Sequence, residues 1–264
     1  MGSCGVGRAT RGGATELVDI VPLALGTKLT LKAGCVLISD GASRVLVDPG
    51  CFATRALLEQ ALQAAAGIGV ADIDVLFFTH LHFDHYNDLG FADVPRVLMP
   101  RKEVAEVAVL TGLRGDVAAY TERIRAQHHH VAPVFLRQFL RLIDDRRYDF
   151  ARISFAPRLE LVAPGHPVTP NLRVIDLPGH SIGQVGLSMR TRFGHTAVVA
   201  DAALSAEDYR QSGIGHHLVV FDPEALLRTR AQLAGFDCIV PGHGAWFNPR
   251  TGAPVTEQLE ECHV

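Results

Sequence analysis

Apolar residues follow two patterns along the chain: short runs typical of β-strands, and longer segments in which they recur at helical spacing. In the first part of the chain, strands are predicted at residues 17–25, 28–38, 44–47, 73–78 and 96–99. The dipeptide Asp40-Gly41 predicts a hairpin between the second and third of these strands. Helices are predicted at 54–66 and 102–110, so β and α elements alternate after an antiparallel meander.

The pattern changes between residues 111 and 150, where helices are predicted at 117–127 and 134–144. We interpret 111–150 as a helical insertion. Its second half is amphipathic, so its apolar side must contact the main body, a partner subunit or a bound substrate. We expect by default that this apolar side packs on the main body of the domain. We also consider that residues 113–150 form a lid over the functional site or the contact of a possible homodimer.

Strand patterns return in the last part of the chain, at 158–162, 171–177, 184–189, 196–200 and 238–240, with a helix at 222–235. Because meander, helix and strand occur in both parts, the order predicts two halves packed sheet against sheet with helices outside. One large α/β domain over residues 17–264 is favoured by the length. Residues 1–16 are Gly-rich and polar, and we expect a flexible N-terminus there.

Composition narrows the class of protein. A hydrophobic fraction of 48% with 20% charged residues is typical of a well-buried globular enzyme. The net charge of -3 provides no global attraction for nucleic acid, so a nucleic-acid partner is not expected. The five cysteines are scattered and form no C-x-x-C pair, which indicates reduced thiols in a cytoplasmic protein. No apolar run approaches the ~18 residues of a membrane span, and no membrane partner is expected.

The densest group of metal-ligand types follows the apolar run at 73–78, where the chain continues Thr79-His80-Leu81-His82-Phe83-Asp84-His85. In an extended segment His80, His82 and Asp84 would lie on one side, and a tight turn could bring in His85. Imidazole and carboxylate without thiolates suit zinc, iron or manganese better than calcium or magnesium. Spacing alone does not decide which of these residues share a metal.

Three further candidates lie where predicted strands end: His180, Asp201 and His243. Loops at strand ends are where a rigid sheet presents functional groups. Each of these residues alone could equally be part of a turn or a cap, so their weight comes from the combination with the first group.

The combination resembles the metallo-β-lactamase superfamily from about Leu17 to Trp246: His80-x-His82-x-Asp84-His85, then His180, Asp201 and His243, with Asp48 at the end of an early strand. This resemblance implies an αββα sandwich of two mixed β-sheets, with helices on the outer faces and a dinuclear metal site at the sheet edge. By carry-over, one metal would bind His80, His82 and His180, and the second would bind Asp84, His85 and His243. Asp201 would bridge the two metals, and Asp48 would orient a ligand.

Two divalent metal ions, most simply zinc with iron or manganese as alternatives, have a direct chemical use. At a separation of ~3.5–4 Å they lower the pKa of a bridging water, and the resulting hydroxide can attack a carbonyl carbon or a phosphorus. The ions also stabilise the charge that develops on the substrate, and Asp84 is placed to pass a proton to the leaving group. The prediction is a metal-dependent hydrolase in which Asp84 and Asp201 have catalytic roles.

An ester, lactone or thioester is the expected substrate. The motif is most similar to that of lactonase-like hydrolases, which cleave acyl-homoserine lactones and other esters. That group carries a Tyr soon after the bridging Asp, whereas Ala202-Ala203-Leu204 follow Asp201 here and Tyr209 lies further on. Glyoxalase II members carry a C-terminal helical domain for glutathione, and only residues 245–264 follow His243, so a glutathione thioester is less favoured.

Two alternatives stay open. An RNase Z-like phosphodiesterase or nuclease could use the arginines of the insertion as a phosphate patch, but neighbouring Asp and Glu residues nearly offset them. A non-catalytic metal-binding scaffold is the second alternative, and the complete ligand set argues against it. We interpret His128-His129-His130 as an exposed loop, and the pair His216-His217 as a candidate substrate contact near the rim of the site.

Overall fold

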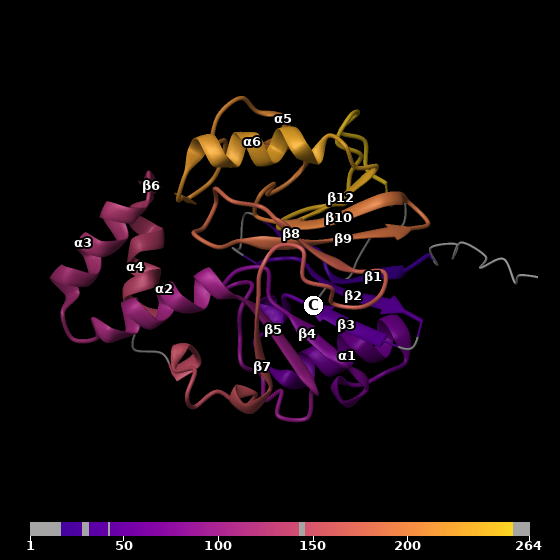
Figure 1. The fold of residues 1–264 in the computed structure, drawn as a ribbon, viewed down its shortest axis with the longest axis horizontal. Helices are drawn as coiled ribbons and strands as arrows, with labels where there is room; N and C mark the ends of the chain where they lie inside the picture. The colour runs from indigo at the N-terminus through magenta and orange to yellow at the C-terminus, as the bar shows by residue number, and fades with distance from the viewer. Residues whose placement is uncertain (1–16, 28–31, 42, 143–145, 256–264) are drawn as a thin grey trace, which may run out of the picture.

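Two mixed β-sheets face each other in the computed structural model, and helices cover both outer faces (Figure 1). The structure describes residues 17–27, 32–41, 43–142 and 146–255, so the N-terminus predicted to be flexible lies outside the described residues. The predicted αββα sandwich is confirmed. Among the described residues, no helix is long and apolar enough to span a membrane.

The larger sheet has the order β1-β2-β3-β4-β5-β7, with antiparallel pairing in its first two ladders and parallel pairing in the rest. Its strands are β1 (Asp19–Ala24), β2 (Cys35–Asp40), β3 (Ser43–Val47), β4 (Val75–Phe77), β5 (Arg96–Pro100) and β7 (Leu159–Val162). Asp40 pairs with Ser43 across the predicted hairpin, and Gly41 adopts a φ of 59°, a conformation that glycine accepts without steric cost.

The smaller sheet has the order β12-β10-β9-β8, in which only the β12–β10 pair is parallel. Its strands are β8 (Arg173–Asp176), β9 (Val185–Thr191), β10 (Gly194–Ala200) and β12 (Cys238–Pro241). A separate two-stranded ladder pairs β6 (His130–Val131) with β11 (Val219–Val220).

The helices are α1 (Arg55–Ala66), α2 (Arg101–Gly112), α3 (Val117–Gln127), α4 (Pro133–Leu142), α5 (Ala206–Arg210) and α6 (Pro223–Leu233). Short 3-10 helices span Pro49–Cys51, Val70–Asp72, Arg146–Tyr148 and Ala156–Arg158. The side chains of Thr54, Asp116 and Asp222 accept hydrogen bonds from backbone N–H groups in the first turns of α1, α3 and α6. Helices α2, α3 and α4 lie to one side of the sandwich (Figure 1).

The period-two alternation of the strands sorts the core into layers. Val36 and Ile38 of β2 point between the sheets, where they share a cluster with Leu187 and Val198 of the smaller sheet. The alternate residue of β2, Leu37, packs on the opposite face with Leu58 and Leu62 of α1. On the far side, residues of β10 and β12 pack with α6 in the same way: Ala197, Val199, Leu233 and Ile239. Both sheets are therefore covered on both faces.

The structure corrects the second predicted strand. The apolar pattern predicted residues 28–38, but β2 begins at Cys35, and residues 28–31 lie outside the described residues. Thr27 and Lys32 instead pair with each other, and the Gly34 N–H donates to the Gly242 carbonyl at 2.6 Å. Just before β2, the backbone of Gly34 therefore bonds to the loop after β12 and not to a neighbouring strand.

The predicted insertion is not wholly helical. Helix α2 continues to Gly112, and the predicted helix at 134–144 corresponds to α4, with 143–145 outside the described residues. The predicted exposed loop at 128–130 is partly a strand, because His130 pairs with Val220 and the His129 N–H donates to the Phe221 carbonyl. His128 is half-buried against Phe221, with ring centroids 5.9 Å apart. His129 and His130 are exposed, as predicted, but the pairing with β11 makes part of this segment a strand.

Candidate metal centre

Five strands of the two sheets end at one shared edge, and the predicted ligands follow them. Asp48 comes directly after β3, the motif at 79–85 follows β4, His180 follows β8, Asp201 follows β10, and His243 follows β12. All eight predicted side chains are buried, each with less than a tenth of its surface exposed. The structure therefore brings together residues from both ends of the chain.

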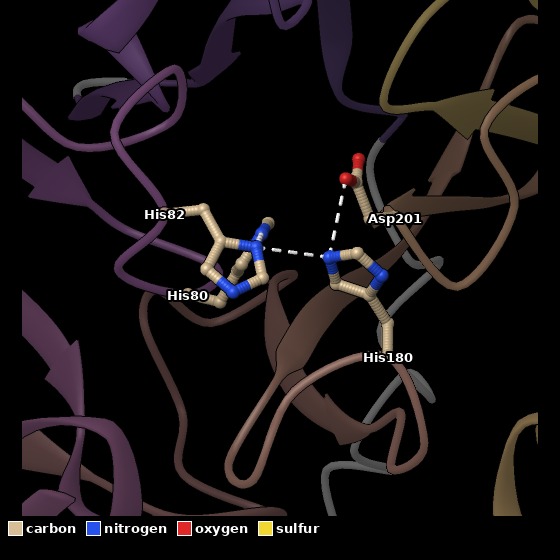
Figure 2. A group of neighbouring side chains, drawn as sticks. All are labelled: His80, His82, His180 and Asp201. Atoms are coloured by element: carbon tan, nitrogen blue, oxygen red, sulfur yellow. Dashed lines mark hydrogen bonds and ion pairs between the residues drawn. The ribbon is translucent and has the colours of Figure 1, made fainter. Parts of the chain in front are cut away.

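The first group of donors consists of His80, His82, His180 and Asp201 (Figure 2). His82 Nδ1 lies 3.0 Å from His80 Nε2 and 2.9 Å from His180 Nε2. His180 Nε2 is also 3.3 Å from Asp201 Oδ2. A tetrahedral zinc ion with ligand bonds of ~2.0–2.1 Å needs donors about 3.3–3.4 Å apart, so these separations are close to those of a zinc site.

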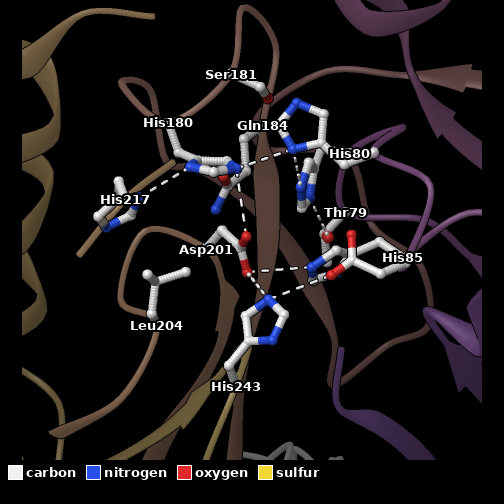
Figure 3. Close-up of polar contacts among 12 residues, drawn as sticks. Thr79, His80, His85, His180, Ser181, Gln184, Asp201, Leu204, His217 and His243 are labelled. Atoms are coloured by element: carbon white, nitrogen blue, oxygen red, sulfur yellow. Dashed lines mark hydrogen bonds and ion pairs between the residues drawn. The ribbon is translucent and has the colours of Figure 1, made fainter. Parts of the chain in front are cut away.

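The second group consists of Asp84, His85 and His243. His243 Nε2 lies 3.4 Å from Asp84 Oδ2 and 3.4 Å from Asp201 Oδ1. His85 Nε2 lies 3.1 Å from the same Asp201 oxygen (Figure 3). One oxygen of Asp201 thus faces the first group and the other faces the second, which is the arrangement expected of a bridging carboxylate.

Buried polar atoms in this centre fit a cation. His85 Nε2 and Asp201 Oδ1 are fully buried, and neither makes a well-aligned hydrogen bond to any described residue. Buried nitrogen and oxygen atoms nearly always have a partner, because an unsatisfied one costs free energy. A set of imidazole nitrogens and carboxylate oxygens is also the donor chemistry that zinc, iron and manganese accept.

Burial keeps three of the imidazoles neutral. It lowers the pKa of His80 and His180 well below the usual range, and it lowers the pKa of His82 to about 3. A neutral imidazole has a free lone pair, which is the form that binds a metal. The first donor group is therefore ready to bind a cation at neutral pH without releasing a proton.

For the carboxylate of Asp201, neighbouring charges together have a larger effect on the pKa than burial has. Burial by itself would raise its pKa, but the neighbouring His243 and His85 outweigh burial and hold the pKa well below the usual range. Burial would also lower the pKa of His85, yet the carboxylates of Asp201 and Asp84 raise it. Negative charge thus persists in the middle of the centre, where it attracts either a proton on His85 or a metal ion.

Asp48 orients His85 from behind. Its carboxylate accepts hydrogen bonds from His85 Nδ1 at 2.9 Å, from the Thr79 N–H at 2.8 Å and from Thr79 Oγ1 at 2.5 Å. With Nδ1 occupied in this way, Nε2 of His85 is directed into the centre. Asp48 itself adopts a φ of 51°, which Asp tolerates better than most residues. This geometry supports the predicted role of Asp48.

Glu103, in the first turn of α2, contacts two loops that carry metal-ligand candidates, which the sequence pattern did not reveal. It is buried, and its Oε1 accepts hydrogen bonds from Ser181 Oγ and the Gly183 N–H, both at 2.7 Å. Its Oε2 accepts one from the Leu81 N–H at 3.3 Å. Glu103 therefore joins the loop of His80 and His82 to the loop of His180. Its position resembles an ordinary acidic residue at a helix start, so only the structure distinguishes it.

A cavity of about 310 Å³ opens onto the donors. Beyond the donors and His217, it is lined by Phe135, Leu204, Glu207, His216, Leu218 and Val219. Phe135 belongs to α4, and its ring centroid lies 5.1 Å from that of His82, so the predicted insertion contributes directly to the cavity wall. Tyr209 does not line the cavity, since its hydroxyl donates to the Arg230 carbonyl at 3.0 Å.

The low pKa of His82 predicts a pH dependence in the metal-free chain. The unfolded chain binds this proton near pH 6.5, while the folded state resists it until about pH 3, so folding stability is lost as the pH falls below 6.5. Relative to His82→Gln, the unmodified chain should lose about 2 kcal/mol of unfolding free energy between pH 7.5 and pH 5. Urea denaturation of chelator-treated protein measures this, with His129→Gln as the surface control. A difference independent of pH would contradict the assignment.

Gly242 leaves room for Asp201, which predicts the effect of a methyl group there. A Cβ at this position would lie 1.9 Å from Asp201 Oδ1, so the carboxylate must move in Gly242→Ala. We expect a folded protein whose zinc affinity is lowered about tenfold or more, as seen when ligand geometry is disturbed. Elemental analysis after dialysis and circular dichroism test this. Gly235→Ala is the matched control, because its methyl group would meet the nearest atom at 3.4 Å. Unchanged zinc content would refute the explanation.

Comparisons with known proteins identify the family of this chain. The metallo-β-lactamase superfamily model matches residues 33–243. A metallo-β-lactamase family protein of Thermus thermophilus has 22% identity and a TM-score of 0.60, over 87% of this chain and 75% of that one. An AiiA mutant of B. thuringiensis, with N-decanoyl-L-homoserine at its active site, has 15% identity and a TM-score of 0.55, over 84% of this chain and 89% of that one.

A third similar structure is AidC, a dizinc quorum-quenching lactonase, with 16% identity and a TM-score of 0.51 over 77% of this chain and 67% of that one. A search of curated protein sequences finds no significant match. At these identities the structural similarities establish a shared fold, and the family model adds the membership. The chain therefore belongs to the metallo-β-lactamase superfamily.

Proposed function

We propose that this chain is a hydrolase that uses two divalent metal ions, zinc in preference to iron or manganese, to cleave an ester, lactone or thioester bond. The proposal depends chiefly on the position of Asp201. Its Oδ2 lies 3.3 Å from His180, and its Oδ1 lies 3.1 Å from His85 and 3.4 Å from His243, so it can serve two ions at once. Two ions bound there would supply Lewis acidity toward the scissile carbonyl and activate a water molecule for attack.

The chain's own residues perform the remaining tasks. His80, His82 and His180 present neutral imidazoles, and Asp48 and Glu103 hold the loops that carry the ligands. Burial raises the pKa of Asp84, and the Asp201 carboxylate adds to this against the opposing effect of His85. A carboxyl group with a raised pKa can hold a proton and donate it to a leaving group. Asp84 also lines the cavity, where a leaving group would lie, and on this placement it is our candidate for the general acid.

The cavity favours an uncharged substrate with an apolar group. Phe135, Leu204, Leu218 and Val219 form the apolar part of its wall. No Lys or Arg occurs among the described residues that line it, and the acidic Glu207 stands at the rim. Proteins normally recognise phosphate or carboxylate groups with Lys or Arg side chains, so a phosphodiester substrate is disfavoured. Arg123 of the insertion is instead paired with Glu106, with Nη2 and Oε2 2.8 Å apart.

The lactonase structures support the same class of substrate. AiiA holds N-decanoyl-L-homoserine at its active site, and AidC was captured with an acyl-homoserine product. In this chain Ala202, Ala203 and Leu204 place no hydroxyl group after Asp201, and the Tyr209 hydroxyl is used by the Arg230 carbonyl. We infer that charge on the substrate oxygen is stabilised at the metal centre itself, without help from a tyrosine.

A panel assay tests the proposed reaction. One preparation should be assayed for metal content and for turnover of a lactone, a thioester, an aryl ester and a bis-aryl phosphodiester. We expect a carboxylic ester or lactone to be cleaved fastest, activity to be lost with a chelator, and zinc to restore it. Asp201→Ala should reduce kcat/KM by about 10³-fold or more, equivalent to about 4 kcal/mol. Asp19→Ala, an exposed acid on β1, is the control.

Full activity of Asp201→Ala would rule out the two-metal arrangement. Preferential cleavage of the phosphodiester would favour the nuclease alternative, and zinc binding without any turnover would favour a metal-binding scaffold.

Phe135 provides a test of the cavity wall. In Phe135→Ala we expect KM to rise about tenfold for substrates with a long acyl chain, because an apolar contact of this size contributes ~1–3 kcal/mol, while kcat changes little. Substrates with an acetyl group should be much less sensitive. Val134→Ala is the control, since Val134 precedes Phe135 on α4 and is exposed. An equal effect on long and short chains would show that Phe135 does not contact the acyl group.

A further inference from the structure

The second ring nitrogen of His180 has a buried partner. His180 Nδ1 lies 3.0 Å from Nδ1 of His217 (Figure 3). His217 comes from the segment between α5 and β11, and only 4% of its surface is exposed. His217 lines the cavity, so the prediction that it contacts substrate stays open, and its Nδ1 in addition faces a metal-ligand candidate.

Two charged residues hold His217 in place. His217 Nε2 lies 3.2 Å from Asp208 Oδ2, and Arg230 Nη2 lies 2.5 Å from the same oxygen. Arg230 Nη2 is also 2.8 Å from His217 Nε2. Asp208 is fully buried and Arg230 is only 5% exposed, so this is an ion pair withdrawn from solvent.

The same network fixes the cavity wall and the loop after Asp201. Arg230 Nε donates to the Ala202 carbonyl at 3.0 Å, and the Leu204 N–H donates to Asp208 Oδ2 at 3.0 Å. The His216 N–H donates to Asp208 Oδ1 at 3.3 Å. The loop after Asp201 and the segment that carries His216 are therefore both attached to the buried Asp208 carboxylate, and Arg230 adds a second contact to the loop.

Stability alone does not explain such a network, because burying an ion pair costs about as much solvation as it returns in attraction. The geometry of the network indicates that it fixes the position of the His180 ring. His180 Nε2 points at the other donors, so a bound cation takes the lone pair on that nitrogen and the proton must lie on Nδ1. His180 Nδ1 then donates to His217 Nδ1, and His217 carries its own proton on Nε2 and directs it at Asp208 Oδ2. In this state Arg230 Nη2, although it lies 2.8 Å from His217 Nε2, donates to Asp208 Oδ2 and not to His217.

We propose that His217, held by Asp208 and Arg230, is a positioning residue for His180 and sets the affinity of the group His80, His82 and His180 for its metal ion. The inference rests on the proposed function only in requiring that this group binds a metal. Because Leu204 and His216 of the cavity wall are attached to the same carboxylate, metal binding and the shape of the wall are coupled, and by linkage each affects the other.

Zinc affinity measures the contribution of His217. In His217→Leu we expect one of the two zinc sites to weaken about 10- to 100-fold in competition with a chromogenic chelator, while the other site is retained. His217→Asn keeps an acceptor near the position of Nδ1 and should recover part of the loss. His166→Leu is the matched control, because His166 is a half-buried histidine in the turn before β8, away from the centre. Equal zinc binding at both sites in His217→Leu and the unmodified chain would overturn the proposal.

A second measurement uses the unmodified chain and does not depend on the folding of any variant. The ¹⁵N chemical shifts of His217 in the zinc-loaded protein should show an unprotonated Nδ1 and a protonated Nε2. A proton on Nδ1 of His217 in that state would overturn the inference, whatever the variants show. If the unmodified chain binds no zinc at all, the proposed function fails with it; if it binds zinc and only the His217 results disagree, the proposed function stands.

Discussion

The buried carboxylate of Asp201 is the contact on which the centre depends. It lies within 3.4 Å of ring nitrogens of His85, His180 and His243, three residues that reach it from both sheets. Isolating such a charge from water is costly unless it is compensated, and the surrounding imidazoles, together with the cation that we propose, would compensate it. The backbone accommodates it at some cost: Ala200, directly before it, has a φ of 44°, and Gly242 has no side chain where Oδ1 lies.

Three buried polar residues contact the metal-ligand candidates or their loops on the side away from the proposed metal ions. Asp48 fixes His85, Glu103 joins the loops of His82 and His180, and His217 occupies the second nitrogen of His180. These residues come from the end of β3, the start of α2 and the segment before β11, so the centre depends on elements from the whole sandwich. A site supported in this way keeps its donors in position before a metal binds, which limits the reorganisation that binding requires.

Apart from Leu204, which follows Asp201, the apolar cavity wall comes from parts of the chain that carry no metal-ligand candidate. Helix α4 supplies Phe135, and the segment after α5 supplies Leu218 and Val219. The β6–β11 pairing connects these two parts, so the insertion and the C-terminal half form the wall together. In the proposed hydrolase, the metal-ligand candidates and most of the apolar cavity wall would thus come from different segments.

Apolar periodicity and the spacing of ligand types determined the layered sandwich, the hairpin at Asp40-Gly41, and the set of metal-ligand candidates. These features are local, because a strand or a motif is specified by residues adjacent in sequence. The start of β2, the pairing of β6 with β11, and the roles of Glu103 and His217 depended on the tertiary structure. Glu103 in a helix start and His217 in a loop have ordinary local surroundings. Their functions arise from contacts with residues 22 to 80 positions away in the chain, and only the packing of two sheets at one edge makes those contacts.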